Sequence, residues 1–304
     1  MNNRDIRLIK NKEIDYEKWD ACVSVSKNPL IYVQSWYLDL VFPEWEALVY
    51  GDYEYVMPLT IRHKLGLSFL LQPIFAQQMG IFPEAAHSIQ NRFLTLIRDK
   101  FKYIVLHLHA GHLEPFPEGF ELQHRKNCIL PLSAPYEALK DNYSKHTRRQ
   151  IKKAFDNGVF IVKGIQSKEY MDLKFSLGID KPSQPVMQTL NQIIEYGTGQ
   201  GSGIIYAAYT RENVLCAAAY FLFTQRRVTY LNAVSSLEGK KVNAMHLMVD
   251  QFIREHASMP LTLDFEGSVI PGIARFYEGF GAENETYYCL KYNKLPLPLR
   301  WIKK

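Results

Sequence analysis

The spacing of apolar residues predicts helices and strands that alternate along most of the chain. The clearest stripe at helical spacing predicts a helix over 88–101 and consists of Ile89, Phe93, Leu96, Ile97 and Phe101. Two strand-prone runs on either side of Gly51-Asp52 predict a hairpin. Further strands are expected at 103–108, 128–132, 159–164, 203–209, 214–223, 227–235, 261–265 and 286–292. Helices and strands mixed in this proportion predict an α/β (α+β) fold with mixed sheets.

Capping residues place the other expected helices and suggest a domain boundary. Ser133-Ala-Pro135 can open a helix that runs to Asn142, and Ser144 can cap the next helix through Phe155. Helices are also expected at 16–25, 34–41, 168–177, 184–196, 242–256 and 272–280. The length of 304 residues suits two domains. We therefore expect one domain over 1–132 and another over 133–304, whose C-terminal tail can pack back on the first.

The charge of the chain is small overall but concentrated in one expected helix. There are 36 Lys and Arg against 31 Asp and Glu, a formal net charge of +5. The helix that Ser144 caps has five basic residues, whose total charge of +5 equals the net charge of the whole chain: Lys145, Arg148, Arg149, Lys152 and Lys153. Its free N-terminal amides and its first basic side chains would suit a phosphate or carboxylate. A solvated basic surface is an equally weighted alternative.

Two carboxylates near the end of the strand 261–265 are the most informative group for chemistry. Strand alternation places Thr262, Asp264 and Glu266 on one face. Since a helix is expected to begin near Pro271, both carboxylates lie beside a strand-to-helix crevice, where open α/β sheets commonly bind ligands. A partly desolvated carboxylate can take a proton from an attacking amine, whereas the alternative is structural capping of the turn.

The strand 227–235 leads through a segment with one glycine, Gly239, into the helix 242–256. Alternation predicts that Tyr230 and Asn232 lie on the same side of the sheet as Val228 and Val234. A strand, a small-residue turn and a helix N-terminus can cradle an anion. A single glycine is a weak signal for this, so a connecting role is favoured.

Several other classes of site and location are disfavoured. His107, His109 and His112 supply no converging set of three or four metal ligands, so no metal is expected. Nucleophile elbows, Walker loops and dinucleotide fingerprints are absent. The N-terminus is polar, and the longest apolar run, 214–223, is shorter than a membrane span. The four cysteines form no CxxC pair. We expect a cytoplasmic protein with reduced core cysteines.

Four stretches together resemble the Fem-type aminoacyltransferases and the acyl-CoA N-acyltransferase (GNAT) fold. They are 145–154 with Gly158-Val159, 217–223 with 228–232, the helix from Asn243, and Leu263-Asp-Phe-Glu-Gly267 with Arg275-Phe-Tyr-Glu-Gly-Phe-Gly281. The resemblance implies two tandem GNAT-like lobes with a substrate groove. The chain departs from the family in two places. Tyr277 stands where members often have Lys, and 239–244 lacks the glycine pattern of the acetyl-CoA pyrophosphate loop.

The resemblance implies an enzyme that transfers an acyl or aminoacyl group to an amine, with peptidoglycan or other cell-envelope precursors as candidate substrates. It implies no required cofactor and an anionic acyl donor, either an acyl-CoA or an aminoacyl-tRNA. Asp264 and Glu266 are then the catalytic residues that orient or deprotonate the amine. The residues expected to bind substrate are Lys145, Arg148, Arg149, Tyr230, Asn232, Arg275 and Tyr277. The alternatives are a small-molecule N-acetyltransferase that uses acetyl-CoA and a non-catalytic binding protein that kept the fold.

Overall fold

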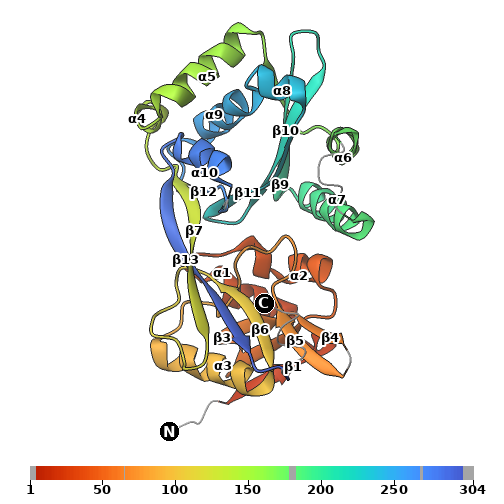
Figure 1. Cartoon of the computed structure of the whole chain (residues 1–304), viewed down its shortest axis with the longest axis vertical. Helices are drawn as coiled ribbons and strands as arrows, with labels where there is room; N and C mark the ends of the chain where they lie inside the picture. Colours follow the sequence, from red (N-terminus) through yellow and green to blue (C-terminus); the bar gives the residue numbers. More distant parts are fainter. Residues whose placement is uncertain (1–4, 65, 178–182, 268–269, 297–304) are drawn as a thin grey trace. The chain divides into compact units, whose positions relative to one another are not determined.

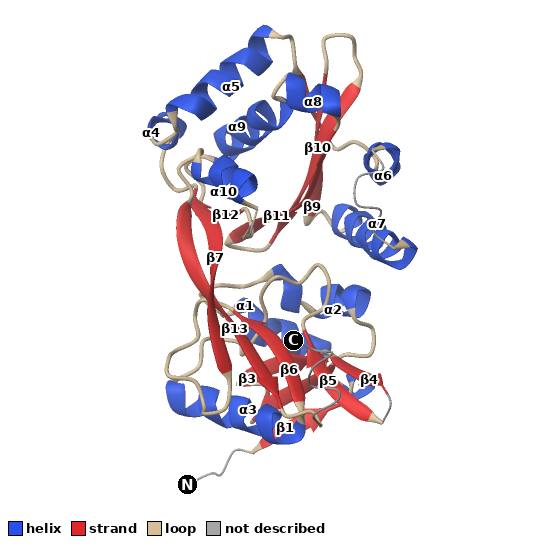
Figure 2. Ribbon diagram, in the orientation of Figure 1, coloured by secondary structure: helices blue, strands red, loops and turns tan. Residues whose placement is uncertain are grey.

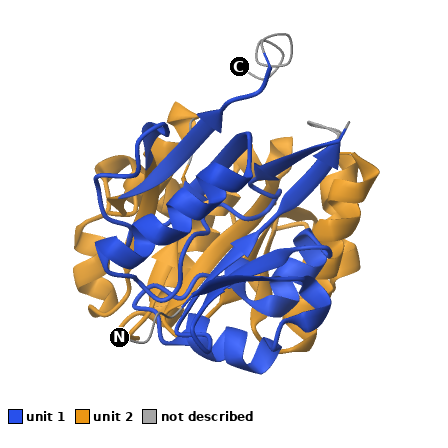
Figure 3. Ribbon diagram, turned by 90° about the horizontal axis from the view of Figure 1, so that it is seen from below, with its two compact units in different colours: residues 1–125, 286–304 blue, residues 126–285 orange. Residues whose placement is uncertain are grey.

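The computed structural model describes residues 5–64, 66–177, 183–267 and 270–296 and divides into two compact units. Unit 1 comprises residues 1–125 and 286–304, and unit 2 comprises residues 126–285 (Figure 3). The chain passes between the units within two strands, β7 (Glu121–Pro131) and β13 (Glu283–Asn293). The domain boundary expected after residue 132 lies just beyond β7, whereas the units divide inside that strand. Of the expected tail, residues 297–304 lie outside the described residues.

Unit 1 contains two groups of paired strands with helices packed around them (Figure 1). The first group has the antiparallel order β1 (Ile6–Ile9), β2 (Glu46–Tyr50), β3 (Tyr55–Leu59). The second has the order β4 (Ile61–Lys64), β5 (Leu67–Leu71), β6 (Tyr103–Leu108), β13. Thus the strand closest to the C-terminus pairs antiparallel with β6. The helices of this unit include α1 (Tyr16–Ser24), α2 (Ser35–Val41) and α3 (His87–Lys100).

Unit 2 is a mixed sheet covered by helices on both faces (Figure 2). Its strands follow the order β7, β12 (Thr262–Asp264), β11 (Arg227–Ser235), β10 (Leu215–Phe223), β9 (Gly203–Tyr209), β8 (Phe160–Lys163). One face is covered by α5 (Lys145–Asp156), α9 (Ala244–His256) and α10 (Pro271–Glu278). The other is covered by α6 (Ser167–Ser176) and α7 (Gln184–Gly199). Two short helices, α4 (Tyr136–Asp141) and α8 (Leu237–Lys241), precede α5 and α9.

The core of unit 2 forms where α9 packs on the sheet. The apolar stripe of α9 is fully buried and includes Met248, Phe252 and Ile253. The Phe252 ring stacks on Phe221 of β10, with ring centroids 3.8 Å apart. Burial of one such side chain contributes about 1.5–3 kcal/mol, so this stripe anchors α9 to the sheet.

Most of the expected elements are present, and the mixed α/β fold class is confirmed. The bounds of β6, β9 and β11 agree with the expected ranges. Ser144 is the N-cap of α5 as predicted, because its Oγ accepts a hydrogen bond from the Thr147 amide at 3.1 Å. The short elements β1, β5 and α8 were not predicted, and the strand expected over 53–62 is divided between β3 and the start of β4. Within the described residues, none of the helices has the length and apolar character needed to cross a bilayer.

A β-bulge in β11 changes which of its side chains face which helices. Tyr220 of β10 pairs with Asn232, but the next residue, Phe221, pairs with Tyr230, so β11 contains one extra residue there. Tyr230 consequently packs in the core below α9 and near Tyr277 of α10, while Asn232 contacts Tyr170 of α6. The prediction that Tyr230 and Asn232 share a face is wrong, because a single inserted residue shifts the period-two pattern.

The four cysteines are free thiols in the interior, as expected. Burial raises the pKa of Cys22 to about 12 and that of Cys216 to about 11. A thiol with so high a pKa stays protonated at neutral pH and is a poor nucleophile. Their contribution is therefore packing.

Hydrogen bonds hold the buried His112 of unit 1 in a neutral form. Nε2 of His112 accepts from the Ile81 amide at 3.2 Å, and its Nδ1 donates to the His109 carbonyl oxygen at 3.1 Å. Because an amide can only donate, Nε2 of His112 carries no proton. Burial, with His109 as the second cause, holds the pKa of His112 well below its ordinary value. Among the described residues, no group of three or more His, Cys, Asp or Glu is arranged to hold a metal ion.

We expect unit 1 to lose stability as the pH falls below about 6.5, the ordinary pKa of an unfolded histidine. The folded pKa of His112 is depressed, so the unfolded chain binds the extra proton. The stability is complete above the unfolded pKa and declines towards the folded pKa, by at most about 1.4 kcal/mol per pH unit. Urea titrations followed by the fluorescence of Trp19, Trp36 and Trp45 report on this unit.

The matched variant is His112→Gln, which removes the titrating group. It should be less stable at neutral pH, because the buried Ile81 amide loses its acceptor, but it should show a shallower dependence on pH. An unchanged pH slope in the variant would assign the effect to another group.

Candidate functional site

A cavity of about 600 Å³ opens in unit 2 where β11 loses its parallel partner. β12 pairs only with Arg227, Val228 and Thr229 at the start of β11. After Asp264 the chain follows β7 instead, through backbone hydrogen bonds between Phe265 or Glu266 and Cys128. Among the described strands, nothing pairs with this edge of β11 from residue 230 to 235. The divergence of two parallel strands therefore creates the cavity.

The walls of the cavity come from β11, Gly239 and Lys240 of α8 (Leu237–Lys241), the start of α9, the turn at Glu266 and one side of α10. Aromatic rings form much of the surface next to α10. The Tyr277 ring stacks on Phe265 with centroids 4.8 Å apart and meets Tyr230 edge-on at 6.0 Å. Burial raises the pKa of both phenols, so Tyr230 and Tyr277 are protonated hydrogen-bond donors at neutral pH.

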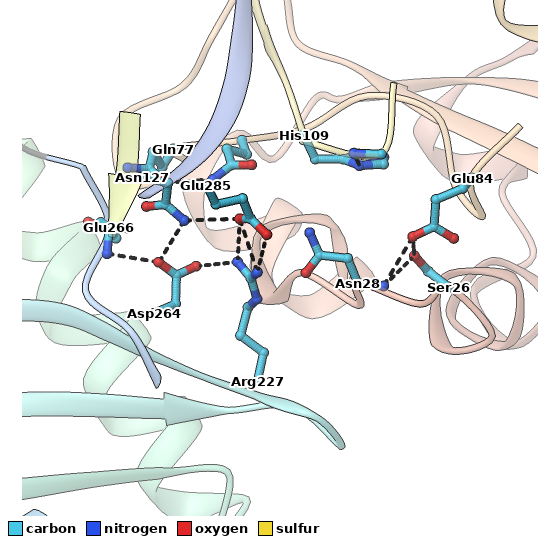
Figure 4. Close-up of polar contacts among 12 residues, drawn as sticks. Ser26, Asn28, Gln77, Glu84, His109, Asn127, Arg227, Asp264, Glu266 and Glu285 are labelled. Atoms are coloured by element: carbon cyan, nitrogen blue, oxygen red, sulfur yellow. Dashed lines mark hydrogen bonds and ion pairs between the residues drawn. The ribbon is translucent and has the colours of Figure 1, made fainter. Parts of the chain in front are cut away.

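Asp264 belongs to a buried ion-pair network and is not among the residues that line the cavity (Figure 4). Its Oδ2 accepts from Nη1 of Arg227 at 2.7 Å. Its Oδ1 accepts from Nδ2 of Asn127 at 3.0 Å and from the Glu266 amide at 2.8 Å. Arg227 also donates through Nη2 to Glu285 at 3.1 Å. Both oxygens of Asp264 are thus engaged in holding β11, β7 and the turn at Glu266 together.

Glu266 is the carboxylate that lines the cavity. Its backbone has φ of +60°, a left-handed conformation that is uncommon for a residue with a side chain. The hydrogen bond from its amide to Asp264 helps to hold this conformation. The negative charge of Glu266 is, after burial, the next cause of the raised pKa of Tyr277, and both residues line the same cavity.

His246, near the start of α9, also lines the cavity. Its ring packs edge-on against Phe276 of α10 at 4.8 Å. Burial, with nearby His146 as the second cause, lowers the pKa of His246 to about 4. The imidazole is therefore neutral at physiological pH and is a hydrogen-bonding group rather than a cation.

The expected cationic residues lie on the surface and do not line the cavity. Lys145, Arg148 and Arg149 project from the first turns of α5. Arg148 donates to the Asp141 carbonyl oxygen at 2.7 Å, and Arg275 is exposed on α10. Of the residues singled out in the sequence, the cavity thus brings together Tyr230, Asn232, Glu266 and Tyr277. Ligand binding by the four cations stays a prediction.

The segment after β11 forms the short helix α8. Ser236 caps it, because its Oγ accepts from the Gly239 amide at 3.0 Å. A Cβ on Gly239 would lie 2.3 Å from the carbonyl oxygen of Cys216, so the glycine allows α8 to pack directly on β10. Close packing accounts for this glycine without an anion.

Sequence reasoning missed Arg227, His246 and the α6 residues Tyr170 and Lys174. Arg227 begins a strand and has no signal of its own, since its carboxylate partners are distant in the sequence. Tyr170 and Lys174 are spaced by one helical turn and both donate to Asn232. That spacing shows that they share a helix face, but not which strand the face meets.

Comparison with known proteins shows the fold. No protein-family model matches the chain, and no curated protein matches it by sequence. The crystal structure of FemX has a TM-score of 0.67 at 14% identity and covers 95% of this chain and 98% of its own. The C-terminal domain of a putative lysylphosphatidylglycerol synthetase from Agrobacterium fabrum has a TM-score of 0.56 at 9% identity, and the match covers 96% of this chain and 95% of that domain.

A conserved protein of unknown function from Bacteroides thetaiotaomicron has a TM-score of 0.64 at 10% identity, with 96% of this chain and 100% of its own covered. Identities this low show a common fold and no more. They support the expected Fem-type, GNAT-like fold.

We expect Arg227→Met to destabilise unit 2 by about 3–5 kcal/mol, because it leaves the buried carboxylate of Asp264 without its cation. Urea unfolding followed by far-UV circular dichroism measures the loss. The control is Arg226→Met at the exposed neighbouring position, which should change stability by about 0.5 kcal/mol or less. Equal effects of the two substitutions would mean that the network adds no stability.

Proposed function

We propose that this chain transfers an acyl or aminoacyl group to an amine in the cavity beside β11, with a cell-envelope precursor as the acceptor. The observation behind the proposal is the position of Glu266, a carboxylate on the wall of a cavity that also presents two protonated phenols. The fold likeness to FemX supports the same reading.

Acyl transfer of this kind needs an oriented donor, a deprotonated amine and stabilisation of an oxyanion. The unpaired edge of β11 can hold an extended donor by backbone hydrogen bonds, as an added strand would be held. The amine nitrogen attacks the carbonyl carbon, and the carbonyl electron pair moves to oxygen. Glu266 takes the proton that the nitrogen loses. That electron pair then returns to re-form the carbonyl, and the bond from the carbonyl carbon to the donor's oxygen or sulfur breaks. The leaving oxygen or sulfur keeps the electron pair of the broken bond and takes a proton.

Tyr277 is placed to serve the leaving group. Its phenol stays protonated at neutral pH because burial and the charge of Glu266 raise its pKa. It can therefore donate a hydrogen bond or a proton where negative charge develops. A tyrosine can do this where many relatives of this fold have a lysine, although it brings no positive charge. None of these steps calls for a metal or a prosthetic group.

The donor in this proposal is anionic, and α5 supplies the attraction. Lys145, Arg148 and Arg149 are exposed near its start. His146 of the same helix lies next to the cavity residue His246, with ring centroids 6.1 Å apart. An aminoacyl-tRNA suits this surface, and lysylphosphatidylglycerol synthetase is, by its name, an enzyme of aminoacyl transfer. Acetyl-CoA is the rival donor. The segment 239–244 lacks the glycine pattern of a pyrophosphate loop, and Gly239 of α8 serves to pack that helix on β10.

The test offers the full chain alanyl-tRNA, lysyl-tRNA and acetyl-CoA with amine acceptors, and mass spectrometry detects the new amide. A donor that binds the folded chain should also raise its melting temperature. Transfer from a charged tRNA supports the proposal, and transfer from acetyl-CoA alone favours the acetyltransferase. If no donor is used for transfer and none raises the melting temperature, the proposal is contradicted in favour of a non-catalytic binding protein.

We expect Glu266→Gln to lower kcat by about 100-fold or more, because the amide cannot take the proton of the amine. The substitution keeps the size and the hydrogen-bonding shape of the side chain. Glu278→Gln on the exposed side of α10 is the matched control and should keep full activity. Normal turnover by the Glu266 variant would exclude this carboxylate as the base.

A further inference from the structure

We infer that Asn232 donates hydrogen bonds to the oxygen of the transferred acyl group and that Tyr170 and Lys174 of α6 hold it in that orientation. The inference rests on the acyl transfer proposed above and assigns the oxygen site of that reaction. Asn232 lies just past the bulge of β11 and lines the cavity. Asn232 therefore contacts α6 and also belongs to the wall of the cavity.

The amide orientation follows from its partners. Oδ1 of Asn232 accepts from the Tyr170 hydroxyl at 2.6 Å and from Nζ of Lys174 at 2.8 Å. A lysine ammonium group has only donors, so the atom that faces it must be the carbonyl oxygen. The nitrogen Nδ2 is then directed away from α6. Among the described residues none accepts a hydrogen bond from it, and Asn232 is one of the residues that line the cavity. In this inference its two N–H bonds face the cavity.

Lys174 is an unusual cation in this unit. Burial lowers its pKa, and no carboxylate of the described residues lies within ion-pair distance of its Nζ. A half-buried charge without a counter-ion is costly, and its described hydrogen-bond partner is the Asn232 oxygen. Tyr170, fully buried one helical turn earlier, donates to the same atom. The site therefore uses two donors from α6 to fix one side chain of β11.

This arrangement suits an oxygen that gains negative charge. Two donors on the carbonyl oxygen of an amide polarise it, which makes its N–H groups stronger donors. A preorganised donor of this kind stabilises the tetrahedral intermediate more than the ground-state carbonyl. The ligand class is the carbonyl oxygen of an acyl or aminoacyl ester or thioester. The positive charge of Lys174, on the far side of Asn232, adds to the same effect.

The first test needs no turnover. Sodium acetate is the probe, because its oxygen carries the charge that the intermediate would carry, and ¹⁵N-resolved NMR follows the side-chain amides. We expect the Asn232 Nδ2 signals to move saturably on titration, while those of Asn191 of α7, whose Nδ2 donates to Glu195 and which does not line this cavity, stay in place. Lys174→Met should reduce the Asn232 shift, and Lys174→Arg should restore it. An Asn232 signal that acetate leaves unmoved would overturn the inference.

The second test measures transfer with the donor that serves the wild-type chain. Asn232→Ala should lower kcat by about 100-fold with KM changed less than about threefold, because the lost bond forms mainly in the transition state. Lys174→Met should lower kcat by less, and Lys174→Arg should recover part of it. Lys168→Met, at an exposed position of the same helix, is the control and should be unaffected.

The outcomes separate this inference from the proposed function. If the wild-type chain transfers from no donor, the proposed function fails, and the acetate titration still decides whether Asn232 is an oxygen site. If transfer occurs but Lys174→Met changes only the melting temperature and neither kcat nor the NMR shift, the positioning role is wrong. An unchanged kcat in Asn232→Ala would remove Asn232 from the oxygen site.

Discussion

The ion pair between Arg227 and Asp264 holds the point at which β11 and β12 separate. Arg227 begins β11 and Asp264 ends β12, and the two strands pair only between these residues. Because Asp264 also accepts from the Glu266 amide, the same carboxylate holds the turn that carries Glu266 to the cavity wall. Two charges buried this deeply are costly unless their hydrogen bonds are satisfied, and Asn127 and Glu285 complete the set. The cavity depends on a structural ion pair beside it.

Because of the bulge in β11, side chains on both faces of one sheet contribute functional groups to this cavity. Before the bulge, Tyr230 packs towards α10 with Tyr277, and after it Asn232 is bonded to α6. A regular strand would direct both side chains to one face. The inserted residue instead places phenols on one side of the strand edge and a polarised amide on the other. Glu266 reaches the same cavity from the turn after β12, so three separate segments supply the proposed catalytic groups.

Much of the fold follows from local pattern. Long apolar stripes such as that of α9, the cap at Ser144 and the apolar run of β9 depend on neighbouring residues, and the bounds of these elements were predicted closely. The crevice beside Glu266 was also predicted, because a strand end followed by a helix is visible in the sequence. The separation of Asp264 from Glu266 was not, since it depends on Arg227, which is 37 positions away. The basic helix was found as a helix, but its charge pattern left anion binding and a solvated surface equally weighted, and its predicted substrate-binding cations do not line the cavity.

By itself, the sequence determined most of the helices and strands, the mixed α/β class and four of the residues that line one cavity, Tyr230, Asn232, Glu266 and Tyr277. These depend on periodicity, capping and turn chemistry, which act over a few residues. Only the tertiary structure decided which carboxylate is buried with an arginine and which faces the cavity. It also decided that Asn232 meets α6 and that Gly239 serves packing. Such contacts join residues distant in the chain, and a one-residue bulge is enough to redirect a side chain.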